Sequence, residues 1–148
     1  MKRILLGLAS AALATSTIVC AAEFGTAAEA RAMLDKVVDA MKADEAKALE
    51  MFTKGEGGFK DRDLYPYCIG PDGNFSAHPT LVGTDATGLK DKAGAPVGEK
   101  VLAAANAEPG EISEVAYVWT RPGEDTPADK VVFVTRIGDQ ICAVGYYK

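Results

Sequence analysis

Two residues, His78 and Lys130, carry side chains that could bind an anionic ligand. His78 is the only histidine of the chain, and Lys130 opens a run of apolar residues typical of a strand. An imidazole can donate a hydrogen bond to a carboxylate, and an ammonium group attracts a carboxylate more strongly in a partly dry site than in water. We expect His78 to titrate near physiological pH, which would make such binding pH-sensitive. The competing interpretations are a histidine that caps backbone groups and a lysine exposed at a strand edge.

Two pairs of aromatic residues accompany these polar groups. Tyr65 and Tyr67 are two positions apart, as are Tyr117 and Trp119. In an unbroken strand, residues two apart point to the same face, so each pair presents two rings to one side of a sheet. Such rings either fill a core or line a small cavity, where their OH and NH groups would orient a ligand.

The other polar residues form no recognisable catalytic or metal-binding set. One histidine, without a cluster of Cys or acidic residues at ligand spacing, argues against zinc, and no nucleophile is paired with a base. We therefore expect no catalysis, no metal and no cofactor. The run Asp61-Arg62-Asp63 is expected at the surface or as a capping group, with Arg62 as a secondary anchor for an anion.

Cys68 and Cys142 allow two interpretations. If the protein is exported to an oxidising compartment, they can form a disulfide that closes a long loop. They can also be two separate buried thiols that act as small apolar side chains. No C-x-x-C motif is present, which argues against a redox-active dithiol.

The N-terminus has the pattern of a secretory signal peptide. Lys2 and Arg3 are followed by an acid-free apolar run over residues 4–19, which is short for a membrane helix. We expect cleavage after Ala22, which leaves a single domain over residues 23–148 in the periplasm or outside the cell. A leader retained as a membrane anchor is the alternative.

The charge of the chain excludes one class of partner. The formal net charge is −5, and loss of Lys2 and Arg3 with the leader makes it −7. A protein that neutralises phosphates needs an excess of basic residues, so we expect no nucleic-acid partner.

The sequence predicts an α+β domain with one antiparallel sheet. Thr26 and Glu29 form a capping-box pattern, and apolar residues then recur at three- and four-residue intervals from Ala30 to Met41. Asp44 is placed to cap a second helix, which Gly55 would end. Pro66 lacks an amide donor, so its strand should lie at an edge or leave that position unpaired. The remaining predicted elements are strands over 64–69 and 74–78, a long covering loop over 79–96, a helix over 97–107, and strands over 112–120, 130–137 and 140–147.

An ordered set of short motifs resembles the single Cache domain family of extracytoplasmic sensor modules. It begins with Phe59-x-Asp-Arg-Asp-Leu-Tyr65, Pro71-Asp-Gly73, Ala77-His-Pro79 and Leu81-Val-Gly83. It continues with Asp91-Lys-Ala-Gly94, Val101 and Leu102, Val115-x-Tyr-x-Trp119, Lys130 and Val144-Gly-Tyr-Tyr147. The similarity extends over almost the whole chain after the leader.

The resemblance implies a PAS-like sheet of five antiparallel strands. A long N-terminal helix would cover one face, and a loop-helix crossover would close a small-ligand pocket on the other. Family members commonly bind small organic acids or related metabolites, and most belong to chemoreceptors and histidine kinases. Because this chain ends directly after the last predicted strand, we expect a freestanding binder rather than a receptor. The ligand-binding residues implied are Tyr65, Tyr67, His78, Tyr117, Trp119 and Lys130.

The leading hypothesis is therefore binding of a small metabolite, with a carboxylate favoured, and no chemistry. A second hypothesis is a protein interaction or envelope structural module that presents a sheet face or the helical region 26–52 to a membrane receptor or to a second copy. An exposed stripe of Met33, Val37 and Met41 would favour it. A small hydrolase or isomerase ranks last, because no acid–base pair with a nucleophile can be named.

Overall fold

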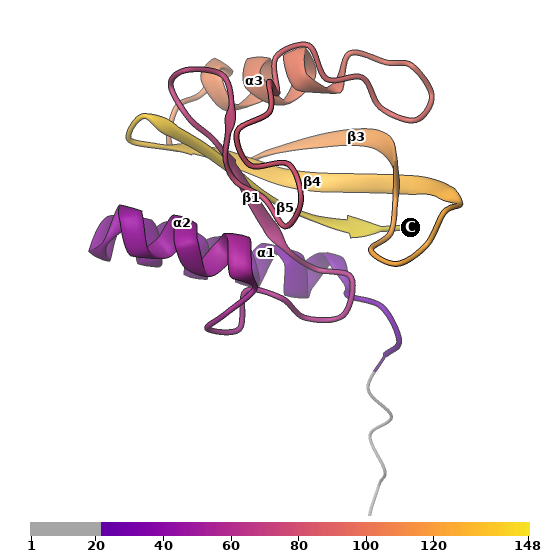
Figure 1. Cartoon of the computed structure of the whole chain (residues 1–148), viewed down its shortest axis with the longest axis horizontal. Coiled ribbons are helices and arrows are strands. Elements are labelled where there is room, and N and C mark those ends of the chain that lie inside the picture. The colour runs from indigo at the N-terminus through magenta and orange to yellow at the C-terminus, as the bar shows by residue number, and fades with distance from the viewer. Residues whose placement is uncertain (1–21) are drawn as a thin grey trace, which may run out of the picture.

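The computed structural model describes residues 22–148, so the predicted leader lies outside the described residues except for Ala22. The described residues form three helices and five strands in the order expected, and Figure 1 shows their arrangement. Within the described part of the chain, no helix is both long and apolar enough to cross a membrane. The bounds are α1 Ala27–Ala43, α2 Glu45–Lys54, β1 Pro66–Ile69, β2 Phe75–Ala77, α3 Val97–Ala107, β3 Ser113–Thr120, β4 Pro127–Ile137 and β5 Gln140–Tyr147.

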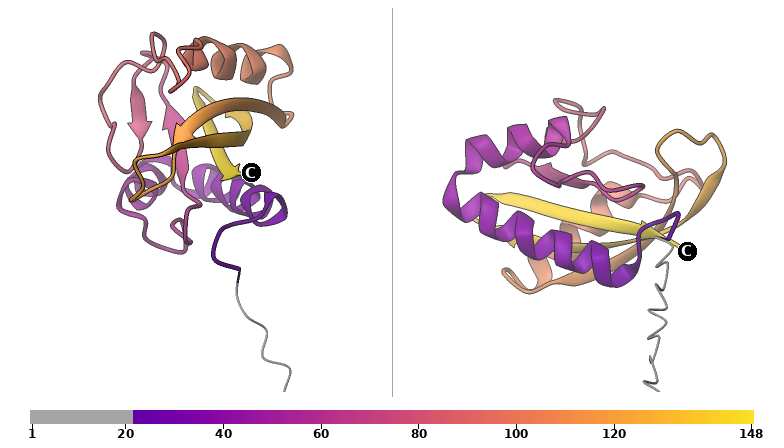
Figure 2. Two further views of the ribbon diagram at one scale, coloured as in Figure 1. Left: turned by 90° about the vertical axis from the view of Figure 1, so that its right-hand side faces the viewer. Right: turned by 90° about the horizontal axis from the view of Figure 1, so that it is seen from below.

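The five strands form one antiparallel sheet with the order β2-β1-β5-β4-β3. Helices α1 and α2 cover one face, and α3 lies over the other with the loop that precedes it (Figures 1 and 2). The predicted α+β class and the PAS-like arrangement are confirmed. Each sheet face has its own apolar core, so the two faces can serve different purposes.

The helical face is held by local signals that the sequence shows directly. Thr26 and Glu29 form the predicted capping box, and the Asp44 side chain accepts a hydrogen bond from the Lys47 amide at the start of α2. Gly55 ends α2 in the left-handed conformation, with φ of 70°, that glycine adopts without strain. The apolar stripe of α1 is buried against the sheet, including Met33, Val37 and Met41. The exposed stripe that would have favoured an interaction module is therefore absent from α1.

The strand that contains Pro66 is not an edge strand. β1 lies between β2 and β5, but its pairing with β2 extends only over Cys68 and Ile69. Pro66 pairs with Val144 of β5 and has no neighbour in β2, so its missing amide breaks no bond of the β1–β2 ladder. The position is thus unpaired toward β2, as the second predicted placement required, but it is paired toward β5.

One strand begins earlier than predicted. β4 starts at Pro127 rather than at Lys130, because Thr120, Trp119 and Val118 of β3 extend the pairing to residues 127–129. A proline is tolerated at the first position of a strand, where its missing donor has little effect. Lys130 therefore lies inside the strand, three residues from its start.

The disulfide between Cys68 and Cys142 is confirmed. The two residues are direct partners on β1 and β5, their Sγ atoms are 2.08 Å apart, and both are fully buried. They belong to the core on the helical side of the sheet. The bond therefore fixes the register of β1 against β5 from the face opposite to α3.

We expect the disulfide to contribute strongly to stability. It links residues 74 positions apart, and closing a loop of this length restricts the unfolded chain by about 4 kcal/mol. The double variant Cys68→Ala/Cys142→Ala should lower the unfolding midpoint by on the order of 10 °C. Mass spectrometry of the denatured wild type should show a gain of about two daltons on reduction. Two thiols that alkylate without reductant would contradict the bond.

Candidate functional site

A cavity lies between the sheet and the α3 side of the molecule. Its walls come from β1, β2, β3, the loop 78–89 and α3, and five of the six predicted site residues line it: Tyr65, Tyr67, His78, Tyr117 and Trp119. The volume open to the centre of a water-sized sphere is about 20 Å³, which is enough for about one water molecule. The cavity is therefore small and mainly aromatic.

A wider groove adjoins this cavity. It offers about 430 Å³ by the same measure, and Tyr65, His78 and Trp119 line both spaces. Its other walls are the end of α2 with the loop after it, and the β3–β4 loop around Arg121. These three side chains lie at the border of the two spaces, so a movement of any of them would change both.

His78 lies at the centre of the aromatic group. Its ring centroid is 5.2 Å from that of Phe75, 5.6 Å from Tyr65 and 6.2 Å from Tyr67. Its Nδ1 accepts hydrogen bonds from the backbone amides of Thr80 at 3.0 Å and Leu81 at 3.1 Å. Because Nδ1 is an acceptor, the proton of the neutral ring is on Nε2, which has no hydrogen-bond partner among residues 22–148. His78 thus both bonds the backbone and keeps one N–H donor for a ligand.

From the sequence we expected His78 to titrate near physiological pH, and this expectation is wrong. Burial, and in second place the positive charge of Lys130, lower the pKa of its imidazole to about 4. The ring is therefore neutral at neutral pH. Tyr67 in the same wall is neutral as well, because burial raises the pKa of its phenol.

Lys130 is the least expected feature of the site. Its side chain is only 1% exposed, so the interpretation as a solvated edge lysine is wrong. Nζ donates a hydrogen bond of 3.0 Å to Oη of Tyr65 and lies 4.4 Å from the centre of the Tyr65 ring, 5.0 Å from Tyr147 and 5.9 Å from Tyr117. Among residues 22–148, no carboxylate lies within 4.0 Å of this ammonium group. Lys130 does not line the cavity itself, but it contacts two residues that do.

The sheet register explains how a lysine fits at this depth. Lys130 of β4 lies directly between Tyr117 of β3 and Tyr147 of β5. Gly145, two residues before Tyr147, leaves space for the lysine stem: a Cβ at this position would be 2.4 Å from Cε of Lys130. Glycine inside a strand often marks such a close approach. The run Val144-Gly-Tyr-Tyr147 shows such a glycine inside a predicted strand, although Gly145 and Tyr147 were not predicted as site residues.

The loop that covers the cavity is tied to β3 by Asp91. Its Oδ1 accepts from the amides of Ala93 and Ala95, and its Oδ2 accepts from the amide of Val118 at 3.0 Å. These backbone bonds, first that of Val118, lower the pKa of the Asp91 carboxyl. In the middle of the loop, Ala86 packs so closely against Gly98 of α3 that a Cβ on Gly98 would lie 1.8 Å from the Ala86 carbonyl oxygen. The covering loop is therefore held to α3 at Ala86 and to β3 at Asp91.

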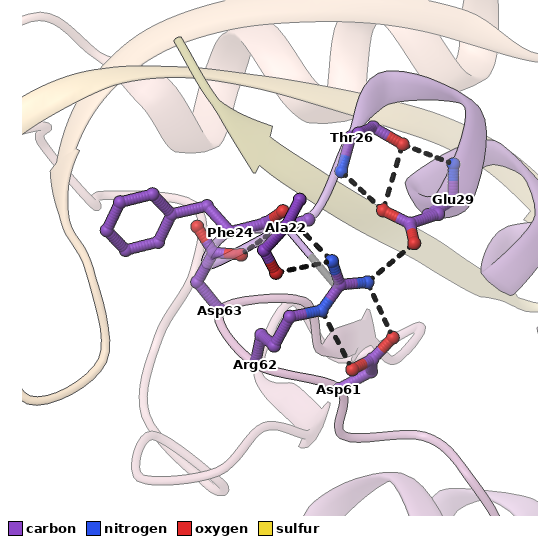
Figure 3. A network of polar contacts seen from close by, with 8 residues as sticks. Ala22, Phe24, Thr26, Glu29, Asp61, Arg62 and Asp63 are labelled. Atoms are coloured by element: carbon purple, nitrogen blue, oxygen red, sulfur yellow. Dashed lines mark hydrogen bonds and ion pairs between the residues drawn. The ribbon is translucent and has the colours of Figure 1, made fainter. Parts of the chain in front are cut away.

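Arg62, the predicted secondary anchor, has a structural role instead. Figure 3 shows its guanidinium bonded to the Ala22 and Phe24 carbonyls and to the carboxylates of Glu29 and Asp61. These five hydrogen bonds use all five N–H donors of an arginine. Arg62 therefore clamps the segment before α1 and keeps no donor for a ligand. No group of three or more His, Cys, Asp or Glu side chains in residues 22–148 is placed to hold a metal ion.

An α+β domain with an aromatic cavity on one sheet face is the architecture expected of a Cache sensor module. The chain belongs to the Single Cache domain 2 family, whose pattern matches residues 17–144. A comparison with curated proteins found no match.

Solved structures of chemosensory domains share the fold. A methyl-accepting chemotaxis protein from Vibrio parahaemolyticus RIMD 2210633 superposes with a TM-score of 0.66 at 21% identity, over 81% of this chain and 86% of that one. A Cache chemosensory domain described for its carboxylic acid recognition has a TM-score of 0.60 at 22% identity, over 80% and 85%. A periplasmic sensor domain of a chemotaxis protein has a TM-score of 0.66 at 24% identity, over 81% and 93%.

Gly145→Ala tests whether this glycine exists to accommodate Lys130. The added methyl group would collide with the lysine stem and with Val132, and overpacking of this kind costs about 1–3 kcal/mol. In a Lys130→Ala background the stem is gone, so the cost of Gly145→Ala should be smaller by about 1 kcal/mol. Urea unfolding of the wild type, the two single variants and the double variant measures the cost of Gly145→Ala in both backgrounds. An equal cost in both backgrounds would show that Lys130 does not set the requirement for glycine.

Proposed function

We propose that the mature protein, residues 23–148, is an exported, non-catalytic sensor domain that binds a small organic acid through its carboxylate. The observation that carries the proposal is the buried ammonium group of Lys130, which has no carboxylate beside it among the described residues. A buried cation without a counter-charge is costly, and an anionic ligand would remove that cost. The aromatic walls strengthen the attraction, because they keep water away from the charges.

Three donors could converge on the carboxylate. Lys130 donates to the phenol oxygen of Tyr65, so the hydroxyl proton of Tyr65 remains available for a ligand. Nε2–H of His78 is the second donor, and its ring packs edge-on against Tyr65 with centroids 5.6 Å apart. Lys130 is the third donor and supplies the positive charge, and it acts on the carboxylate either by direct contact or through the hydroxyl of Tyr65. Tyr67, Tyr117 and Trp119 would enclose the apolar part of the acid.

The size of the cavity requires a movement on binding. A space for about one water molecule is too small for an organic acid, but Tyr65, His78 and Trp119 line both this cavity and the wider groove. Trp119 is partly exposed and is the only tryptophan of the chain. We propose that its displacement admits the ligand, while the loop held by Asp91 stays in place.

Several features support binding rather than the alternatives. The lining residues are aromatic or aliphatic apart from His78, and none of them is a nucleophile paired with a base. The buried stripe of α1 removes the main argument for an interaction module. The similar structures include a periplasmic sensor domain and a domain described for carboxylic acid recognition. We propose the same compartment for this protein, with a membrane receptor or a second copy as its signalling partner.

Replacement of Lys130 should separate ligand binding from stability. Lys130→Met keeps the length of the stem but removes the charge, so the ligand-free protein should be as stable as wild type or more stable. A thermal-shift screen against small carboxylates, amino acids, amines and purines should give a wild-type shift of several degrees for carboxylates. Lys130→Met should reduce that affinity at least about tenfold, since a hydrogen bond to a charged group contributes about 1.5–3 kcal/mol.

The matched control for this screen is Lys36→Met, an exposed lysine of α1 on the opposite face of the sheet. It should bind carboxylates as wild type does. Full carboxylate affinity in Lys130→Met and in His78→Ala would show that the site has been assigned wrongly.

The affinity for a carboxylate should be nearly constant between pH 6 and pH 8. With its pKa lowered to about 4, His78 stays a neutral donor over this range, and the carboxylate of the ligand stays ionised. Isothermal titration calorimetry with acetate or propionate at pH 6, 7 and 8 should give dissociation constants within about threefold of each other. A tenfold weakening from pH 6 to pH 8 would mean that His78 binds the ligand as an imidazolium with an ordinary pKa.

A further inference from the structure

Arg121 is the one arginine at the groove whose hydrogen-bonding capacity is largely unused. It lies in the loop between β3 and β4 and lines the groove that shares Tyr65, His78 and Trp119 with the cavity. Its side chain is 17% exposed and makes one hydrogen bond, from Nη2 to the carbonyl of Lys148 at 3.4 Å. Its buried Nε has no hydrogen-bond partner among residues 22–148.

The ion pairs of Arg121 are long. Nε is 3.5 Å from Oδ2 of Asp63, which itself has no hydrogen-bond partner, and Nη1 is 3.8 Å from Glu124. Arg62 in the same groove makes five hydrogen bonds of 2.7–3.2 Å, and Figure 3 shows their partners. A guanidinium that binds a carboxylate well does so with two parallel bonds of about 2.8 Å. Arg121 is thus held in place, mainly by stacking, with donors free.

The stacking partners place Arg121 close to the ligand site. Its Cζ lies 4.4 Å from the centre of the Phe24 ring and 5.1 Å from that of Tyr147. Nζ of Lys130 lies 5.0 Å from the same Tyr147 ring. The two cationic groups are therefore no more than about 10 Å apart. A single small molecule with an anionic group at each end can span such a distance, since each hydrogen bond covers about 2.8 Å.

The groove wall presents more positive than negative charge around this point. Lys54, Lys60, Arg62 and Arg121 line it, and Glu124 is the only acidic side chain among the lining residues described. Lys54 is paired with Glu50, and Arg62 is fully engaged. Lys60 is exposed, whereas Arg121 is held in place by Phe24 and Tyr147, so Arg121 is the preorganised anchor that the groove offers to a second anionic group.

We propose that the site is built for a small dicarboxylate. One carboxylate would bind at Tyr65, His78 and Lys130, and the other would extend into the groove and bind Arg121. This inference rests on the proposed function and narrows its ligand class. The groove would hold the second carboxylate, because the small cavity has no room for another charged group.

The test compares acids that differ only in the second carboxylate. Succinate is paired with butanoate, and glutarate with pentanoate, in calorimetric titrations of the protein produced with its own leader. We expect at least one diacid to bind at least about tenfold more tightly than its matched monoacid. Arg121→Gln should reduce that preference to less than about threefold while the monoacid affinity changes little.

Two further variants keep the result interpretable. Arg121→Gln leaves the buried Asp63 without its cation, so Arg121→Gln/Asp63→Asn repeats the test without an unpaired charge. Lys54→Gln, in the same groove but paired with Glu50, should retain the wild-type preference for the diacid.

Monoacid binding with no gain for either diacid would overturn this inference and leave the proposed function intact. A diacid preference that survives in both Arg121 variants would also overturn it, and no binding of any of the four acids would overturn both.

Discussion

A lysine buried in the sheet, with no carboxylate next to it in residues 22–148, imposes the main constraint on this structure. The ammonium group of Lys130 is compensated only by the oxygen of Tyr65 and by the faces of three tyrosine rings. Cation–π contacts contribute about 0.5–2 kcal/mol each, which is less than the cost of removing a charge from water. Replacement of such a buried ionic group by an apolar side chain often increases stability. A protein that keeps the lysine must therefore gain something other than stability, and an anion-binding site fits that requirement.

The two faces of the sheet have different roles: one supports the fold and the other forms the candidate site. On the α1 side, the disulfide fixes β1 against β5, and this register places Tyr67 beside Ala143 on the face toward α3. Most residues of the α1 core are fully buried, as expected for a supporting layer. On the α3 side, the same strands present polar groups inside an aromatic wall, and the covering loop is attached to β3 by backbone bonds to Asp91. The site can therefore change around Trp119 without disturbance of the sheet.

Features with a local cause could be predicted from the sequence. The capping box at Thr26 and the end of α2 at Gly55 each depend on a few neighbouring residues, and both are present. Strand periodicity also placed Tyr65 with Tyr67 and Tyr117 with Trp119 on one face. The family resemblance then brought His78 and Lys130 to the same place, where the structure has them close to the cavity.

Features that depend on contacts between distant segments could not be predicted. The depth of Lys130 follows from its neighbours on β3 and β5 and from the missing side chain of Gly145, and no local pattern reports these together. The lowered pKa of His78 has the same origin, because burial and Lys130 cause it. Arg62 and Arg121 looked alike as isolated arginines. Only their surroundings show that the first is saturated with hydrogen bonds and the second is not.

The single histidine and single tryptophan allow the central claim to be tested directly. In ¹H–¹⁵N spectra of the exported protein, the ring N–H signal of His78 and the indole N–H signal of Trp119 can each be assigned without ambiguity. Titration with small carboxylates should shift both signals together, with one dissociation constant, while amide signals of α1 on the opposite face change little. Saturable binding that leaves both signals unchanged, or no saturable change with any small carboxylate, would contradict an anion site built around Lys130.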